Sequence, residues 1–320
     1  MRDALVARAV PSSRAARGRE TLVGLAVLIG VALLPGSLLL AQTPAFKSSV
    51  ATVPLYVTVT DGDGRLVPGL TQQDFEVYDN DKKQELTLFR SDVTPFTATV
   101  MLDTSLSMAL LTELLKNATE QFVIRMLPDD LARVGYFNDK IEFTSEFTND
   151  RDALIRSLDH VDFGNPTRLW DAVDFGLDAL EPLDERRVIV VFTDGDDTDS
   201  RRSRGDVLER TRATGIIVYA IGLDSELVVD GRRIRTSPDR GLRGLAEESG
   251  GGFFHLEKRD ELGSAFTRVV QELHTQYVLG FTPEVFDDEV HELEVKLKRR
   301  GLRARTRRSY VASAQPTKTQ

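Results

Sequence analysis

Five oxygen-bearing side chains in three separate stretches have the types and spacing to bind a metal ion. In "TATVMLDTSLSM" an apolar run ends on Asp103, and Ser105 and Ser107 follow at alternate positions. Thr167 lies in "GNPTRLWDAV", and Asp194 follows a second apolar run in "RRVIVVFTDG". Carboxylate and hydroxyl oxygens suit a hard divalent cation, Mg²⁺ ahead of Mn²⁺ or Ca²⁺, whereas zinc prefers nitrogen and sulfur. Because hydroxyls donate weakly, the ion would stay electrophilic and keep a position open for a carboxylate of another molecule.

The elements around these residues would bring them to one place. From residue 97 to 275 apolar strands alternate with amphipathic helices, which predicts an α/β domain with a doubly wound, mostly parallel sheet. Open sheets of this kind bind ligands at the carboxyl ends of their strands. Asp103 and Asp194 each end a predicted strand and Thr167 begins a predicted helix, so all three would meet at that edge. Helices are expected over residues 150–158, 167–180, 203–214, 240–249 and 260–275.

The segments on either side of this region have the pattern of β-strands. Residues 42–94 and 276–312 alternate apolar and polar side chains. Each segment would be marginal alone, so we expect them to pair into one small β module, with the α/β domain of residues 95–275 inserted between its halves. Separate hairpins packed on the larger domain are the alternative. Residues 313–320 are expected to form a disordered tail.

Residues 1–41 have the composition of a targeting segment. Five arginines precede the uncharged stretch of residues 21–41, "TLVGLAVLIGVALLPGSLLLA". This pattern is typical of a cleaved secretory signal peptide, and the stretch is also long enough for an uncleaved membrane anchor. Either interpretation predicts an extracytoplasmic protein, secreted or periplasmic. The absence of cysteine excludes disulfides and thiolate metal sites, and the net charge of −9 argues against general nucleic-acid binding.

The three metal-binding stretches resemble the von Willebrand factor type A (VWA) family and its metal-ion-dependent adhesion site. The family pattern is D-x-S-x-S, then a distal threonine, then an aspartate, and this chain fills all five positions with Asp103, Ser105, Ser107, Thr167 and Asp194. The resemblance implies a Rossmann-like fold, hydroxyls close to the metal, and aspartates acting largely through water. The flanking segments are similar to a bacterial group of secreted VWA-related proteins. Adhesion through metal-bridged protein contacts is the behaviour that the resemblance implies.

Several residues near this pattern allow more than one interpretation. Asp103 and Ser105 could do no more than cap the helix that follows. Trp170 could belong to the core or could line the rim of the metal face, where Asp196 is the second candidate for partner binding. The acidic loop that contains Asp196 is expected to be solvated, with a second Ca²⁺ site as the alternative. The alternating arginines between residues 296 and 308 predict one solvated strand face, or a surface for anionic lipid headgroups or polymers.

No enzyme signature accompanies the candidate site. A phosphatase of the haloacid dehalogenase type needs a second aspartate where this chain has Ser105, and no G-x-S-x-G, Walker or G-x-G-x-x-G pattern is found. We therefore expect a non-enzymatic module that captures an Asp or Glu of a partner protein through the metal. A structural envelope protein that binds through its β module is the alternative, with a hydrolase a more distant one. The sequence does not indicate an oligomeric state.

Overall fold

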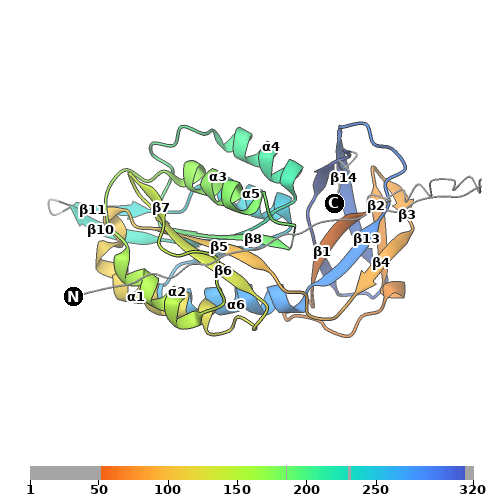
Figure 1. The fold of residues 1–320 in the computed structure, drawn as a ribbon, viewed down its shortest axis with the longest axis horizontal. Coiled ribbons are helices and arrows are strands. Elements are labelled where there is room, and N and C mark those ends of the chain that lie inside the picture. Colours follow the sequence, from red (N-terminus) through yellow and green to blue (C-terminus); the bar gives the residue numbers. More distant parts are fainter. Residues whose placement is uncertain (1–51, 185, 230–231, 314–320) are drawn as a thin grey trace, which may run out of the picture. The chain divides into compact units, whose positions relative to one another are not determined.

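The centre of the structure is a six-stranded sheet. The computed structural model describes residues 52–184, 186–229 and 232–313, whose arrangement is shown in Figure 1. The strand order is β12–β9–β8–β5–β6–β7, and all neighbours are parallel except β6 and β7. The strands are β5 (Thr97–Asp103), β6 (Leu131–Phe137), β7 (Ile141–Phe143), β8 (Arg187–Thr193), β9 (Ile217–Leu223) and β12 (Phe253–Leu256). The mostly parallel α/β sheet that the sequence predicts is confirmed.

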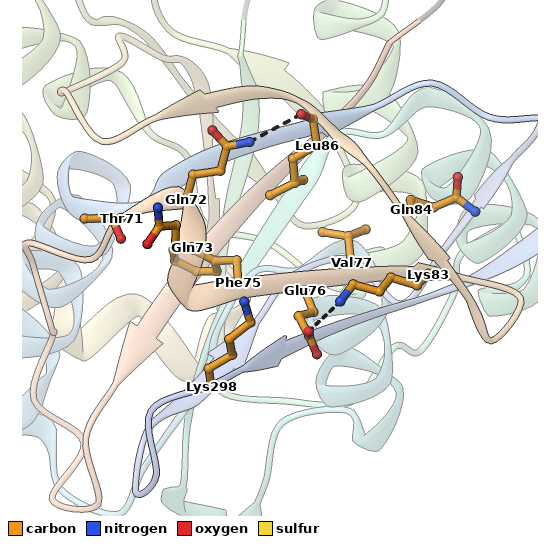
Figure 2. A pocket seen from close by; sticks show the side chains of 10 residues that line it. All are labelled: Thr71, Gln72, Gln73, Phe75, Glu76, Val77, Lys83, Gln84, Leu86 and Lys298. Atoms are coloured by element: carbon orange, nitrogen blue, oxygen red, sulfur yellow. Dashed lines mark hydrogen bonds and ion pairs between the residues drawn. The ribbon is translucent and has the colours of Figure 1, made fainter.

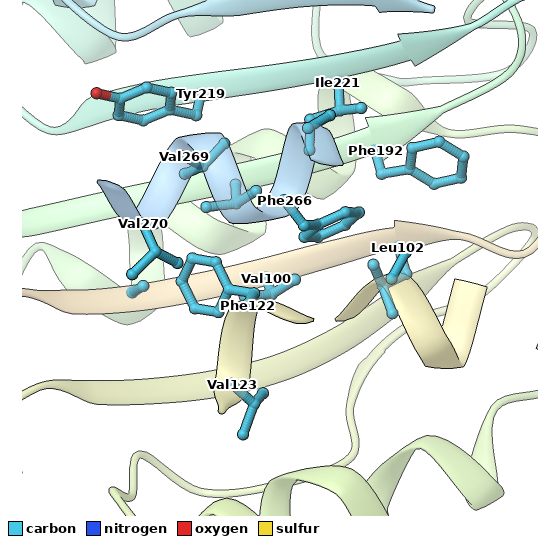
Figure 3. Packing of buried hydrophobic residues seen from close by; sticks show 14 of the residues in the cluster. Val100, Leu102, Phe122, Val123, Phe192, Tyr219, Ile221, Phe266, Val269 and Val270 are labelled. Atoms are coloured by element: carbon cyan, nitrogen blue, oxygen red, sulfur yellow. The ribbon is translucent and has the colours of Figure 1, made fainter. Parts of the chain in front are cut away.

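Helices cover both faces of this sheet. One face carries α1 (Thr112–Val123), α2 (Arg151–Ser157) and α6 (Leu262–Thr275), and the other carries α3 (Leu169–Leu180), α4 (Arg204–Thr214) and α5 (Arg240–Ser249) (Figure 1). Each face has its own apolar core. In the first core, Phe122 of α1 and Phe266 of α6 pack near Val100 and Phe192 of the sheet (Figure 3). Burial on both faces explains the continuous apolar runs of β5 and β8.

The two flanking segments pair with each other to form the β module. One of its sheets has the order β15–β1–β13–β4, in which strands from the two ends of the chain alternate, and the other has the order β16–β14–β2–β3, in which the C-terminal β14 pairs with the N-terminal β2. The strands are β1 (Val53–Thr60), β2 (Phe75–Asp79), β3 (Lys82–Gln84), β4 (Leu86–Arg90), β13 (Tyr277–Phe281), β14 (Val290–Leu297), β15 (Arg303–Arg305) and β16 (Ser309–Val311). A separate apolar core, which includes Leu55, Val77 and Leu279, fills the space between the sheets.

The β module packs against the amino ends of the parallel strands. Arg186, directly before β8, is buried, donates to the carbonyl of Leu273 at 2.7 Å and lies over the ring of Tyr56 in β1. Gln276, at the end of α6, donates to the hydroxyl of Thr58 in β1 at 2.8 Å. Because β5 and β8 run away from this junction, their carboxyl ends lie at the opposite edge of the sheet.

The prediction of a solvated face for the basic C-terminal run is wrong for two of its arginines. Arg305 forms an ion pair with Glu272 of α6, whose side chain is buried, and its guanidinium lies over the ring of Tyr219. Arg307 lies over the ring of Tyr310, and burial lowers its pKa. These side chains face the α/β domain, because strand β15 and the residues after it cover the ends of its elements.

The sequence pattern missed one hairpin. Strands β10 (Ser225–Val229) and β11 (Arg232–Thr236) form an antiparallel pair that follows β9 and therefore begins at the carboxyl edge of the central sheet. The "DG" pair between them was an available hairpin signal. No helix in the described part of the chain is long and apolar enough to cross a membrane. The predicted targeting segment, residues 1–41, lies outside the described residues, as does all but the first residue of the predicted tail.

Candidate metal site

The five predicted ligands lie on loops at the carboxyl edge of the central sheet. Asp103 is the last residue of β5, and Ser105 and Ser107 lie where the chain enters the 3₁₀ turn Leu106–Leu111. Asp194 directly follows β8, and Thr167 lies two residues before α3. Strands β5 and β8 are parallel neighbours, which brings Asp103 and Asp194 side by side.

Four of these residues form one continuous hydrogen-bond network. The backbone N–H of Ser105 donates to Asp103 Oδ1 at 2.8 Å. The hydroxyl oxygens of Ser105 and Ser107 are 2.8 Å apart, and the Ser107 hydroxyl donates to Asp194 Oδ1 at 2.8 Å. Both serines therefore face the space between the two strand ends, which is more than a helix cap requires.

Backbone hydrogen bonds join the loop that carries Thr167 to the other two loops. The N–H of Gly164 donates to the carbonyl of Thr104 at 3.1 Å, and the N–H of Thr198 donates to the carbonyl of Thr167 at 2.9 Å. In return, the N–H of Thr167 donates to the Thr198 hydroxyl at 2.9 Å. The structure thus places Thr167 at the same edge, although no hydrogen bond of the described residues joins its hydroxyl to the other four predicted ligands.

The two carboxylates are buried without an ion-pair partner among the described residues. Asp103 is 0% exposed and Asp194 1% exposed, and no Lys or Arg of the described residues forms an ion pair with either. Burial raises the pKa of Asp103 to about 6; the hydroxyl of Thr193 opposes this rise and the charge of Asp194 adds to it. Burial also raises the pKa of Asp194, against the hydroxyls of Ser107 and Ser225 and the positive charge of Arg259. Such a pair favours a positive ion beside it.

One atom of the site is left unsatisfied. Asp194 Oδ2 is buried and has no hydrogen-bond partner among the residues that the structure describes. An unpaired buried acceptor costs about 1–3 kcal/mol, and more when it is charged. A divalent cation bound by oxygen ligands would satisfy this atom and balance both carboxylates, so the residues present fit such an ion. The described residues contain no group of three or more His, Cys, Asp or Glu side chains that could hold a metal ion, and a cation here would therefore depend on the hydroxyls.

Sequence reasoning missed two residues that support the site. Thr193 donates from its hydroxyl to Asp103 Oδ2 at 2.5 Å, which fixes the second oxygen of that carboxylate. Asp197 accepts hydrogen bonds at Oδ1 from the backbone N–H groups of Leu169 at 2.9 Å and Trp170 at 3.4 Å. It therefore caps α3, whose own N-cap residue has no capping side chain. The acidic loop is thus solvated only in part.

The two candidate rim residues differ in exposure. Asp196 is exposed, as a partner-binding residue must be. Trp170 is 5% exposed and belongs to the core beneath α3, which is the first of the two alternatives that the sequence leaves open for it. From sequence the two roles could not be separated, because the face of α3 on which Trp170 lies depends on how the helix packs.

Comparison with protein families identifies the α/β domain. The profile described as the von Willebrand factor type A domain matches residues 99–268, more than half of the 320-residue chain. The chain belongs to the VWA family. The matched residues run from β5 into α6 and include all five predicted ligands. A comparison with curated protein sequences gives no significant match.

Several solved structures are similar to this VWA protein. An aerotolerance-related membrane protein from Bacteroides fragilis, with multiple mutations to serines, is 18% identical over 55% of this chain and 99% of its own, with a TM-score of 0.46. Proximal thread matrix protein 1 from the mussel byssus, with a zinc-occupied MIDAS motif, is 18% identical over 60% of this chain and 48% of its own, with a TM-score of 0.49. A von Willebrand factor type A protein from Catenulispora acidiphila is 10% identical over 83% of this chain and 75% of its own, with a TM-score of 0.48. At these values none of them assigns a ligand or partner to this chain.

Proposed function

We propose that this VWA protein is an extracytoplasmic, non-enzymatic module that binds a partner protein through a divalent cation. The ion, Mg²⁺ ahead of Mn²⁺ or Ca²⁺, would be held by Asp103, Ser105, Ser107, Thr167 and Asp194, and would supply an electrophilic centre for an Asp or Glu carboxylate of the partner. The observation that carries the proposal is the buried, unsatisfied Oδ2 of Asp194 within a network of hydroxyls. The extracytoplasmic location is supported by the N-terminal sequence pattern alone.

The chemistry of the site supports binding more than catalysis. Three described histidine side chains each bond to a carboxylate elsewhere: His255 to Asp224, His274 to Asp130 and His291 to Asp79. None of these three forms a recorded hydrogen bond with Ser105 or Ser107, so none of them makes a serine–histidine pair at the site. Two carboxylates would balance the charge of a divalent cation, and because the neutral hydroxyls donate weakly the ion would remain electrophilic toward a partner carboxylate.

The proposal is tested by metal binding and by partner capture in the same variants. Calorimetric titration of Mg²⁺, Mn²⁺ and Ca²⁺ into the full chain should show one site that Ser105→Ala removes and Ser91→Ala, at an exposed serine of a distant loop, retains. Capture of proteins from an envelope extract should require the cation and fail for Ser105→Ala. Capture that persists in EDTA would contradict the proposal and assign binding to the β module instead.

A further inference from the structure

An exposed loop of the β module combines apolar and acidic side chains. Residues 284–290, which join β13 to the start of β14, are all exposed. Its apolar members include Val285, 55% exposed, and Phe286, 42% exposed. Its acidic members are Glu284, Asp287, Asp288 and Glu289. Soluble proteins seldom expose clustered large apolar side chains, and such clusters commonly mark interaction sites.

Two of these acids, Asp288 and Glu289, have carboxylates with no recorded partner among the described residues, and of the two Asp288 has the more unusual backbone conformation. Glu284 forms an ion pair with Lys82, and Asp287 accepts a hydrogen bond from the backbone N–H of Glu289 at 3.0 Å. Asp288 has a φ of 60°, an uncommon value for a residue other than glycine, and its backbone N–H donates to the carbonyl of Ala312 at 3.0 Å. Its backbone is therefore held, while its side chain has no recorded partner among the described residues.

The rim of the metal site has features complementary to this loop. Leu106, between the two serines, is 56% exposed, the highest value of any large apolar side chain in the described residues. Arg259 is also exposed, and its positive charge acts on Asp194 of the site. A cation, an arginine and an exposed leucine together suit an acidic segment that carries apolar side chains.

The loop cannot reach the metal site of its own chain. The β module packs against the amino ends of the parallel strands, through Arg186 and Gln276, whereas the metal site lies at their carboxyl ends. The seven residues of β5 alone separate the two edges by about 23 Å. A contact between loop and site therefore requires two molecules.

We propose that the metal site captures the carboxylate of Asp288 from a second copy of this chain, with Val285 and Phe286 of that copy packing on Leu106. The inference rests on the proposed metal-dependent function and names its partner. Because loop and metal site lie at opposite ends of the domain pair, the contact is head-to-tail. Contacts of this type that do not close into a ring produce open-ended chains of molecules.

The test is the mass distribution of the full chain in sedimentation velocity, with Mg²⁺ and with EDTA. Species larger than a monomer should appear in Mg²⁺, grow with protein concentration and disappear in EDTA. Asp288→Asn should abolish them, and Phe286→Ala should weaken association about tenfold through the loss of buried apolar surface. Asp81→Asn is the matched control, since Asp81 is an exposed aspartate at a φ of 63° on another turn of the β module, and it should assemble like the wild type.

Mixing two defective variants gives a sharper result. Ser105→Ala keeps the loop but lacks the metal site, and Asp288→Asn keeps the metal site but lacks the loop; each should be monomeric alone, and the mixture should form only dimers. Ser107→Ala replaces Ser105→Ala if the latter does not fold by circular dichroism. Wild type that binds Mg²⁺ in calorimetry but stays monomeric at all concentrations would overturn this inference and leave the proposed function standing. Failure to bind the metal would overturn both.

Discussion

Replacing Thr193 with valine removes a hydrogen bond from a buried charge and changes little else in shape. The Thr193 hydroxyl is the group that satisfies Asp103 Oδ2, at 2.5 Å, and both residues are 0% exposed. Valine has no hydroxyl and cannot donate this hydrogen bond. Asp103 would then keep a hydrogen bond only at Oδ1, from the backbone of Ser105.

The effect of Thr193→Val on the free energy of unfolding follows from the burial and the charge of the Asp103 carboxylate. A hydrogen bond to an ionised group contributes about 1.5–3 kcal/mol, and an unpaired buried acceptor costs at least as much. The Thr193 hydroxyl also accepts from the N–H of Gly195 at 3.1 Å, but Gly195 is half-buried and water can replace that bond. We therefore expect Thr193→Val to lower the free energy of unfolding by about 2–3 kcal/mol, which corresponds to a fall in Tm of about 4–12 °C for a chain of this size.

The measurement is thermal and urea unfolding in EDTA at pH 8, where Asp103 is ionised because its pKa is about 6. Thr99→Val is the matched control. Thr99 lies in β5 and is 0% exposed, and within the described part of the chain its hydroxyl has no hydrogen-bond partner, so its loss should be neutral or stabilising. Similar unfolding curves for the two valine variants would refute the reasoning that Thr193 stabilises a buried carboxylate.

Three further outcomes are expected. Divalent cation at one hundred times its Kd should stabilise the wild type by about 2.7 kcal/mol, a rise in Tm of about 5–10 °C, and Ser105→Ala should show no rise in the same differential scanning experiment. Asp197→Ala should cost about 0.5–2 kcal/mol in urea unfolding through the lost cap of α3, and should weaken metal binding in calorimetry because Thr167 precedes that helix. Burial alone would lower the pKa of His291, but hydrogen bonds to Asp79 and Asp287 outweigh it and raise the pKa. The stabilisation from His291 is then complete below about pH 6.5 and lost as the pH rises through the raised pKa, so His291→Asn should cost more at pH 5.5 than at pH 9, and equal costs in denaturant unfolding would contradict this.

The candidate site was predictable from sequence because its geometry follows from topology. Asp103 and Asp194 each come directly after an apolar run, and any parallel sheet places the ends of such strands at one edge. The serines at alternate positions then have to lie in the loop beyond that edge. No knowledge of side-chain packing was needed to bring these residues together.

The supporting residues could not be predicted in the same way. The hydroxyl of Thr193 points to Asp103 only because β8 lies beside β5 in the sheet order. Asp197 caps a helix 28 residues earlier in the chain, so its role depends on a loop returning across the edge. The burial of Trp170 likewise depends on which face of α3 meets the sheet. In each case the decisive contact joins elements that are far apart in sequence.

The insertion of the α/β domain into the β module explains why the β module leaves the edge with the candidate metal site uncovered. The inserted domain begins with a parallel strand, β5, and ends with a helix, α6, that runs back along the sheet. Both ends of the insertion therefore lie at the amino edge, and the β module that they join must lie there too. In the described residues only connecting loops and the β10–β11 hairpin occupy the opposite edge. A chain of this order, strands followed by an α/β domain and then strands, consequently places the β module at one edge of the central sheet and the candidate metal site at the other. A carboxylate of the β module can therefore reach the metal site of a second molecule but not the metal site of its own.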